Sequence, residues 1–205
     1  MSEKWLDWGL KLQGIAQNGL TYCDNQYEIE RYEKLREIAA EIMAEYGGVS
    51  RDEVMDYFMA ESGYATPKVD VRGVVFKDDK ILLVKERVDG GWTLPGGWSD
   101  IGDTPSHAVE REIFEESGFI TKASKVLAVY DRNKHPHPPM VQHIYKLFIL
   151  CELQGGEATT SFETTDVGWF SEDAIPPLSI ARTTEQQIAR FYEHHRNLDL
   201  PTDFD

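Results

Sequence analysis

The amino-acid sequence predicts a mixed α/β protein in which a small all-helical domain precedes an α/β domain. In the first 63 residues the apolar side chains recur at helical spacing. From Lys68 onward the pattern changes to short strand-like segments separated by turns, with two helical stretches among them. We therefore expect a helical domain over residues 1–63 and an α/β domain over residues 64–205.

Three helices are expected in the first domain. The first carries Trp5 and Trp8 at helical spacing, and the Asn-Gly pair of residues 18–19 is expected to break it. The second spans about residues 26–46 and ends at a Gly-Gly pair. The third begins with the capping box of residues 50–53, Ser-Arg-Asp-Glu.

The second domain begins with a predicted β-hairpin, VDVRGVVF and ILLVKE, joined by a Lys-Asp-Asp-Lys turn. A helix is expected to begin after Thr104, with Pro105 at its first position, and to end at Gly118. A last helix follows Thr183. The predicted strands are residues 69–76, 81–86, 125–132, 143–153 and 167–170, and the predicted helices are residues 104–117 and 184–196.

The chain is strongly acidic, which restricts its partners. Its 21 basic and 36 acidic side chains leave a formal net charge of −15, which disfavours binding to duplex DNA and to anionic membranes. No run approaches the 18 apolar residues of a membrane span, and the N-terminal stretch does not resemble a signal peptide. The two cysteines, Cys23 and Cys151, indicate reduced thiols in a cytoplasmic protein, and Cys151 is expected to be buried and unreactive.

The helix predicted over residues 104–117 carries three acids close together. Successive helical residues step by about 100°, so Glu112, Glu115 and Glu116 fall in a single sector about 100° wide. A solvated acidic face would normally alternate with lysines, but Arg111 is the only nearby base. Crowded carboxylates repel one another unless a cation neutralises them. We therefore expect these glutamates to bind a divalent ion that prefers oxygen ligands, Mg²⁺ or Mn²⁺.

The surrounding segment, GGWSDIGDTPSHAVEREIFEESGF, resembles the Nudix box, G-x5-E-x7-R-E-U-x-E-E-x-G-U, in which U is apolar. The matching residues are Gly97, Arg111, Glu112, Ile113, Glu115, Glu116, Gly118 and Phe119. One position departs, because Asp103 stands where the family has its first glutamate. In the family that acid orients the box arginine rather than binding metal, so the departure affects loop rigidity and leaves the metal expectation intact.

The resemblance covers nearly the whole chain and implies a fold and an activity. The segments TLPGGWSDIG, VYDRNKH and IPPLSIART are similar to a Nudix subgroup that carries a helical domain before the hydrolase domain. This implies a Nudix-type α/β/α sandwich with a mixed sheet. It also implies hydrolysis of a nucleoside diphosphate linked to another group, with ADP-ribose and CDP-choline as the suggested substrates.

The resemblance also assigns roles to individual residues. It gives metal coordination to Glu112, Glu115, Glu116 and the carbonyl of Gly97. Glu163 is expected to act as a further ligand or as the general base, although an ordinary loop acid is the alternative and Asp166 competes for the role.

For the substrate, Arg72 and Arg132 are the expected phosphate contacts, and Trp98 offers a stacking surface for the base or the linked group. A structural role is the alternative for each of them. Weaker candidates of the same kinds are Lys134, Arg182, Trp92 and Tyr130.

Two further interpretations concern the helical domain. Some Nudix-like domains sense nucleotides without cleaving them and regulate transcription, but residues 1–63 hold 6 basic and 13 acidic side chains, which is unsuited to DNA. The three short helices carry more apolar surface than they can bury among themselves, in stripes that contain Trp5, Trp8, Tyr32 and Ile42. We therefore expect a homodimer, with packing onto its own hydrolase domain as the alternative.

Overall fold

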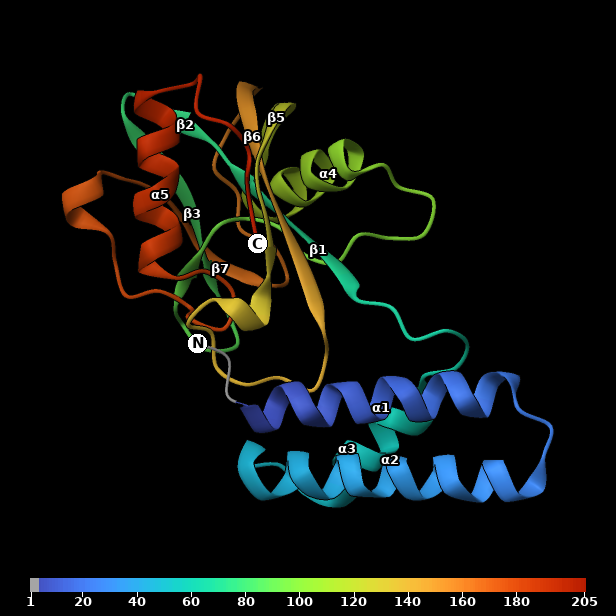
Figure 1. Ribbon diagram of the computed structural model, residues 1–205. Helices are drawn as coiled ribbons and strands as arrows, with labels where there is room; N and C mark the ends of the chain where they lie inside the picture. The colour runs from blue at the N-terminus through green and yellow to red at the C-terminus, as the bar shows by residue number, and fades with distance from the viewer. Residues whose placement is uncertain (1–3) are drawn as a thin grey trace. The chain divides into compact units, whose positions relative to one another are not determined.

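The computed structural model describes residues 4–205, and their fold separates into two units (Figure 1). The first unit contains the chain up to Lys68 together with Asn133–His135 and Pro139–His143. The second contains Val69–Arg132, Pro136–Pro138 and Ile144–Asp205. The boundary predicted after residue 63 falls in the segment between the last helix of the first unit and the first strand.

The first unit is helical: α1 (Lys4–Tyr22), α2 (Gln26–Gly47) and α3 (Arg51–Ala60). The predicted capping box is present, because Ser50 Oγ accepts the Glu53 amide while the Glu53 carboxylate accepts the Ser50 amide. The expected break in α1 at Gly19 is wrong. A β-carbon there would overlap the ring of Tyr32, so this glycine permits close packing of α1 and α2 within a continuous helix. The buried apolar side chains of the unit are Leu6, Ala39, Ala40, Met43, Val54 and Phe58.

The second unit contains two sheets. Within the described residues, one sheet has the order β1-β6-β5-β8, and the other has the order β2-β3-β4 with β7 paired to β3. Most strand pairs are antiparallel, whereas β8 runs parallel to β5, so the sheet is mixed. The strands are β1 (Lys68–Val74), β2 (Phe76–Lys77), β3 (Lys80–Glu86), β4 (Trp92–Thr93), β5 (Phe119–Asp131), β6 (Ile144–Gly156), β7 (Thr164–Phe170) and β8 (Asp203–Phe204). The helical segments are α4 (Pro105–Ser117), α5 (Glu185–Arg196) and the short 3₁₀ turns η1 (Arg132–Lys134) and η2 (Glu172–Ala174).

The predicted hairpin is only partly correct. The turn is present, with Asp78 and Asp79 both at positive φ, as a two-residue hairpin turn requires. However, the predicted strand 69–76 is interrupted near Val75. Its first part, β1, joins the sheet of β6, and its last residues form β2 beside β3. The chain thus changes sheet at this position.

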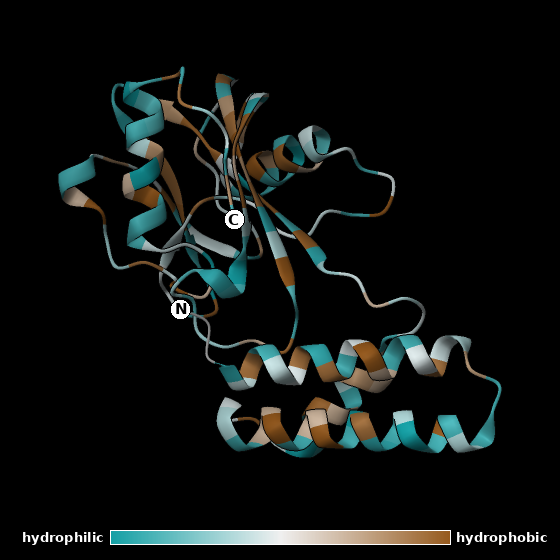
Figure 2. Cartoon of the chain, viewed as in Figure 1, coloured by the Kyte–Doolittle hydropathy of each residue, from teal (hydrophilic) through white to brown (hydrophobic). Residues whose placement is uncertain are grey.

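The two helices α4 and α5 lie on opposite sides of the strands, as Figure 1 shows. Strand β3 explains this arrangement, because Ile81 and Leu83 belong to the apolar cluster that contains α5 residues, and Leu82 belongs to the cluster that contains α4 residues. A strand covered on both faces needs a continuous apolar sequence, which ILLV supplies. In Figure 2 the hydrophobic colour accordingly concentrates on the strands of this unit. The predicted α/β/α architecture is confirmed.

No helix within residues 4–205 is long and apolar enough to cross a membrane.

Candidate active site

Helix α4 forms as its sequence predicts. The side chain of Thr104 accepts the His107 amide at 3.2 Å, Pro105 occupies the first turn, and Gly118 ends the helix in the left-handed conformation with its amide bound to Phe114 O at 2.8 Å. One side of the helix is buried against the strands through Ala108, Val109 and Ile113. The glutamates beside this apolar stripe are therefore held at the edge of the core.

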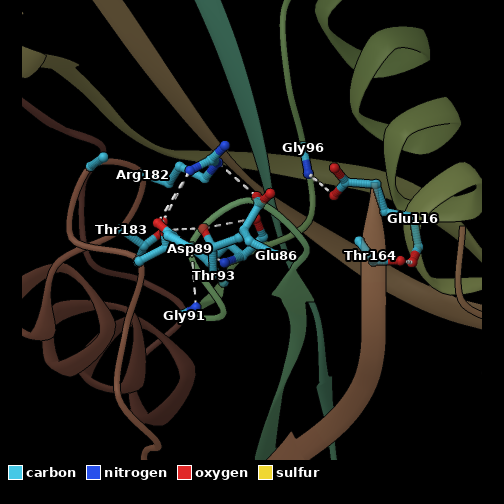
Figure 3. A network of polar contacts seen from close by, with 12 residues as sticks. Glu86, Asp89, Gly91, Thr93, Gly96, Glu116, Thr164, Arg182 and Thr183 are labelled. Atoms are coloured by element: carbon cyan, nitrogen blue, oxygen red, sulfur yellow. Dashed lines mark hydrogen bonds and ion pairs between the residues drawn. The ribbon is translucent and has the colours of Figure 1, made fainter. Parts of the chain in front are cut away.

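Two of the three box glutamates meet the Gly96-Gly97 turn. The amide of Gly96 donates to Oε2 of Glu116 at 2.8 Å (Figure 3). A methyl group at Gly97 would lie 2.9 Å from Oε2 of Glu112, so this carboxylate rests directly against the glycine. The turn itself is fixed by Val71, whose amide donates to Gly97 O at 2.8 Å and whose carbonyl leaves no room for a side chain at Gly96. The structure thus brings together Glu112, Glu116 and Gly97.

Burial makes negative charge costly at this turn. Glu116 is 5% exposed, and burial raises its pKa from 4.5 to about 8, against the opposing effect of the nearby Arg72 guanidinium. Burial also raises the pKa of Glu112, and Arg111 partly offsets this. A bound cation would supply the missing positive charge.

Arg111 forms ion pairs with most of the remaining acids near the box helix. Its guanidinium contacts Asp103 at 3.3 Å, Glu112 at 2.8 Å and Glu115 at 3.0 Å, and it also approaches Asp100. Asp103 therefore orients the box arginine, as the resemblance implies for that position. The Glu115 side chain is 56% exposed and shares Nη1 of Arg111 with Glu112. The part of the chain that the structure describes has no group of three or more acid, histidine or cysteine side chains arranged to hold a metal.

The two arginines expected to bind phosphate are buried. Arg72 donates from Nη2 and Nε to the carboxylate of Asp70, at 2.8 and 3.1 Å, and Lys146 donates to the same carboxylate at 2.6 Å. Arg132 donates to the main-chain oxygens of Pro138 and Ala181. Burial lowers the pKa of Lys146 to about 8, even though Asp70 opposes the shift. Asp70 and Lys146 were not predicted as site residues, because their alternation with apolar neighbours gives no sign of this pairing.

Glu163 lies on an exposed loop that is fastened to the site. Arg87 donates from its side chain to Phe162 O at 2.8 Å and from its amide to Glu163 O at 2.9 Å. The hydroxyl of Thr164 donates to Glu116 O at 2.9 Å, which ties the loop to the end of α4. Glu163 is thus close in the chain to a residue that contacts the box helix.

The remaining candidates have varied surroundings, and Trp98 directly follows the Gly96-Gly97 turn. The carboxylate of Asp166 accepts the amide of Val167. Trp98 is 46% exposed, Trp92 packs against Phe170, and Tyr130 is buried.

A further ion-pair network joins Arg182 to Glu86, an acid that was not predicted as a site residue. Glu86, at the end of β3, is buried and binds Arg182 Nε at 2.7 Å. Arg182 also donates to Ser179 Oγ at 3.1 Å and approaches Asp89 at 3.5 Å. In Figure 3 Glu86 lies between Arg182 and the Gly96–Glu116 pair. The acid that ends the apolar run ILLVKE was the available sequence signal for this site residue.

A family profile described as "NUDIX domain" matches residues 66–193, which is more than half of the chain. The chain belongs to the Nudix family. A second profile, described as "UDP-X-like, N-terminal oligomerisation domain", matches residues 3–58. The resemblance inferred from the box is therefore confirmed, and the chain is a Nudix hydrolase.

Similar proteins support this assignment over the full length. A Bacillus subtilis (strain 168) protein named "Putative ADP-ribose pyrophosphatase YjhB" is 44% identical over 202 residues, which cover 98% of this chain and 97% of that protein. The crystal structure of an ADP-ribose pyrophosphatase from Streptococcus suis 89-1591 is 42% identical with a TM-score of 0.63, covering 68% of this chain and 100% of that one. The crystal structure of a UDP-X diphosphatase is 30% identical with a TM-score of 0.64, covering 100% of both chains.

Proposed function

We propose that this Nudix hydrolase uses a divalent metal to cleave a nucleoside diphosphate conjugate into a nucleoside monophosphate and the phosphorylated partner group. The observation that carries the proposal is the meeting of two box carboxylates, the half-buried Glu112 and the buried Glu116, at the Gly96-Gly97 turn. Carboxylates that lack a full counter-charge thus lie beside a backbone carbonyl, in a chain that belongs to a family of hydrolases.

The donor chemistry fits Mg²⁺ or Mn²⁺. Carboxylate and carbonyl oxygens are hard ligands, and Glu112, Glu115, Glu116 and Gly97 O would hold the ion. When bound, such an ion neutralises phosphate oxygens and lowers the pKa of water. The raised pKa of Glu116 supports the fit, because the carboxylate lacks a full counter-charge from the protein. Glu115 would have to exchange its contact with Arg111 for this role.

For proton transfer we assign the general base to Glu163. Its loop is held by Arg87 and by the Thr164–Glu116 contact, so an exposed carboxylate is carried on an anchored segment. A positioned carboxylate that accepts a proton from water contributes in the usual way to hydrolysis. Asp166 is the weaker choice, since its carboxylate already accepts a main-chain amide.

The names of the similar proteins support the proposed substrate class. Two of them are named for ADP-ribose and one for UDP-X, and all of these compounds share a nucleoside diphosphate joined to another group. We propose ADP-ribose as the first substrate to test, followed by a UDP-sugar. CDP-choline stays a prediction from the sequence resemblance.

The test is a panel of ADP-ribose, UDP-glucose and CDP-choline with Mg²⁺ or Mn²⁺, followed by nucleotide chromatography. Release of AMP, UMP or CMP supports the proposal, and the Glu116→Gln variant should release none. Intact conjugates with both ions would contradict it. Measurable binding without cleavage would instead favour the nucleotide-sensor alternative.

We further propose that the protein is a cytoplasmic homodimer that associates through its helical unit. This unit matches the oligomerisation profile and leaves large apolar side chains exposed: Trp8, Ile15, Ile38, Tyr46 and Met59. Exposed apolar patches of this kind mark association surfaces. The cytoplasmic location is supported by the two cysteines, which are both free.

Sedimentation equilibrium at micromolar concentration tests the dimer. Trp8→Ser should shift the protein toward monomer. Leu198→Ser, which changes an exposed apolar residue of the second unit, should leave the association unchanged. A wild-type monomer would contradict the proposal.

A further inference from the structure

The basic side chains around the site carboxylates differ in how much of their hydrogen-bonding capacity the protein already uses. Arg72 and Lys146 share Asp70, and their side chains are 6% and 3% exposed. Arg132 is equally buried and donates to two main-chain carbonyls. A phosphoryl group would reach these three only if the core opened, so they stabilise the fold.

Arg111 is more accessible, but it is surrounded by carboxylates. It contacts Asp100, Asp103, Glu112 and Glu115. An incoming anion at this guanidinium would be repelled by all four. Arg111 therefore serves to orient the box acids.

Arg182 is in a different situation. Its side chain is 28% exposed, Nε is bound to Glu86, and Nη1 is bound to Ser179 Oγ, near Asp89. Within residues 4–205 its Nη2 donates no hydrogen bond. The planar guanidinium is thus held at Nε and at Nη1, and Nη2 keeps N–H donors for an oxyanion, the kind of contact for which arginine suits phosphate.

The backbone around Arg182 is fixed to the β3–β4 hairpin. Trp92 exchanges main-chain hydrogen bonds with this segment, donating to Pro177 O at 3.0 Å and accepting from Ser179 N at 2.8 Å. A β-carbon at Gly91 would lie 2.5 Å from Ser179 N, so the glycine allows this close approach. The guanidinium is therefore presented from an anchored turn.

The position of Glu86 links this arginine to the box carboxylates. Glu86 interacts electrostatically with Arg72 and with Glu116, and Figure 3 shows it between Arg182 and Glu116. Because Arg72 offsets part of its charge, Glu86 can orient Arg182 without making the whole region strongly negative.

We propose that Arg182 binds a phosphoryl group of the nucleoside diphosphate conjugate, and that Glu86 and Asp89 are positioning residues for its guanidinium. The proposal rests on the proposed function for its substrate class. A diphosphate carries two anionic phosphoryl groups. The box acids and the cation that they would bind lie on one side of Glu86, so they can contact the diphosphate from that side only. Arg182 supplies the charge-assisted hydrogen bonds on the other side.

Steady-state kinetics with ADP-ribose at saturating Mg²⁺ test this inference. Arg182→Gln should raise KM at least tenfold while kcat stays within threefold of wild type, and Arg182→Lys should lie between the two. The matched control is Arg196→Gln, which breaks an arginine–glutamate pair of α5 with Glu172 and should leave both parameters unchanged. A KM for Arg182→Gln within twofold of wild type would overturn the assignment.

The positioning role has its own readout. Glu86→Gln should raise KM less than Arg182→Gln does, and the double variant should show no further increase over Arg182→Gln, because the two side chains act together. Additive effects would show that Glu86 acts independently of Arg182.

A binding experiment separates this inference from the proposed activity. Calorimetric titration with ADP and Mg²⁺ needs no hydrolysis, so it remains informative if the conjugates are not cleaved. Arg182→Gln should weaken ADP binding at least tenfold while its melting temperature stays within a few degrees of wild type. Equal ADP affinity for the variant and the wild type, or no ADP binding by the wild type, would refute the role of Arg182.

Discussion

Replacing Glu116 with glutamine removes one buried negative charge and preserves the size of the side chain. Burial raises the pKa of this carboxyl to about 8 in the folded protein, and the Gly96 amide donates to it at 2.8 Å. The glutamine oxygen can accept the same hydrogen bond. The substitution therefore tests the charge of residue 116 rather than its packing.

The sign and size of the effect follow from the two pKa values. In the unfolded chain the carboxyl titrates near its usual value of 4.5, so between pH 4.5 and about 8 the folded protein holds a proton that the unfolded chain has released. The folded state is favoured most below pH 4.5, and this advantage is lost as the pH rises through about 8. At 1.36 kcal/mol per pKa unit, the full loss is on the order of 5 kcal/mol. Glu116→Gln removes this loss.

Urea denaturation at pH values from 5 to 9, in the presence of a chelator, measures this loss in the free energy of unfolding. The variant should be more stable than wild type at pH 9, and the difference should shrink toward pH 5. Glu115→Gln is the matched control, because this neighbouring acid is on the same helix with its side chain 56% exposed, and it should follow wild type. Added Mg²⁺ should stabilise the wild type and not Glu116→Gln.

Two results would refute the reasoning. If Glu116→Gln were no more stable than wild type at pH 9, the buried charge would not be destabilising. If it hydrolysed conjugates at a near-normal rate with Mg²⁺, residue 116 would not hold the ion.

Further predictions concern other positions. Gly96→Ala should prevent stable folding, because the glycine has a φ of +142° and its β-carbon would overlap a main-chain oxygen of β1, and a soluble variant with a normal melting temperature would disprove this. Gly97→Ala should fold, because only a movable carboxylate oxygen lies in the way, but it should need several times more Mg²⁺ for half-maximal activity. Asp203→Asn should lower the free energy of unfolding at pH 7 by about 1 kcal/mol, because a hydrogen-bonded arginine of α5 lowers the pKa of this carboxyl to about 2. The difference between variant and wild type should disappear as the pH falls from about 4 to 2. A difference that does not depend on pH would exclude this cause. Burial raises the pKa of Cys151 to about 12, so a thiol reagent should modify Cys23 in the native protein and Cys151 only after unfolding, and rapid modification of both would show that Cys151 is accessible.

Local signals in the sequence were sufficient for the box helix and the capping box. Thr104, Pro105 and Gly118 determine where α4 begins and ends, because caps depend on residues within one turn. The spacing of the motif then determines that the box acids share one side of this helix. The burial of β3 on both faces likewise follows from its continuous apolar run.

Local signals gave wrong predictions at positions where a distant segment determines the structure. Gly19 is typical of a helix break, but the ring of Tyr32 occupies the space beside it and α1 continues. The strand expected over residues 69–76 is divided, because its two parts pair with different strands. Neither partner could be identified from local pattern.

The sequence by itself thus determined the family and the α/β/α class, and it predicted the set of acids for a metal. It could not distinguish Glu115 from Glu116, which are adjacent acids of the same type. Only the tertiary structure placed Glu116 against Gly96 and left Glu115 in solvent. It also distinguished the arginines, since Arg72 is bound to a buried carboxylate while the Arg182 side chain is 28% exposed. The physical reason is that burial and pairing depend on residues far apart in the chain, whereas a motif records only their spacing.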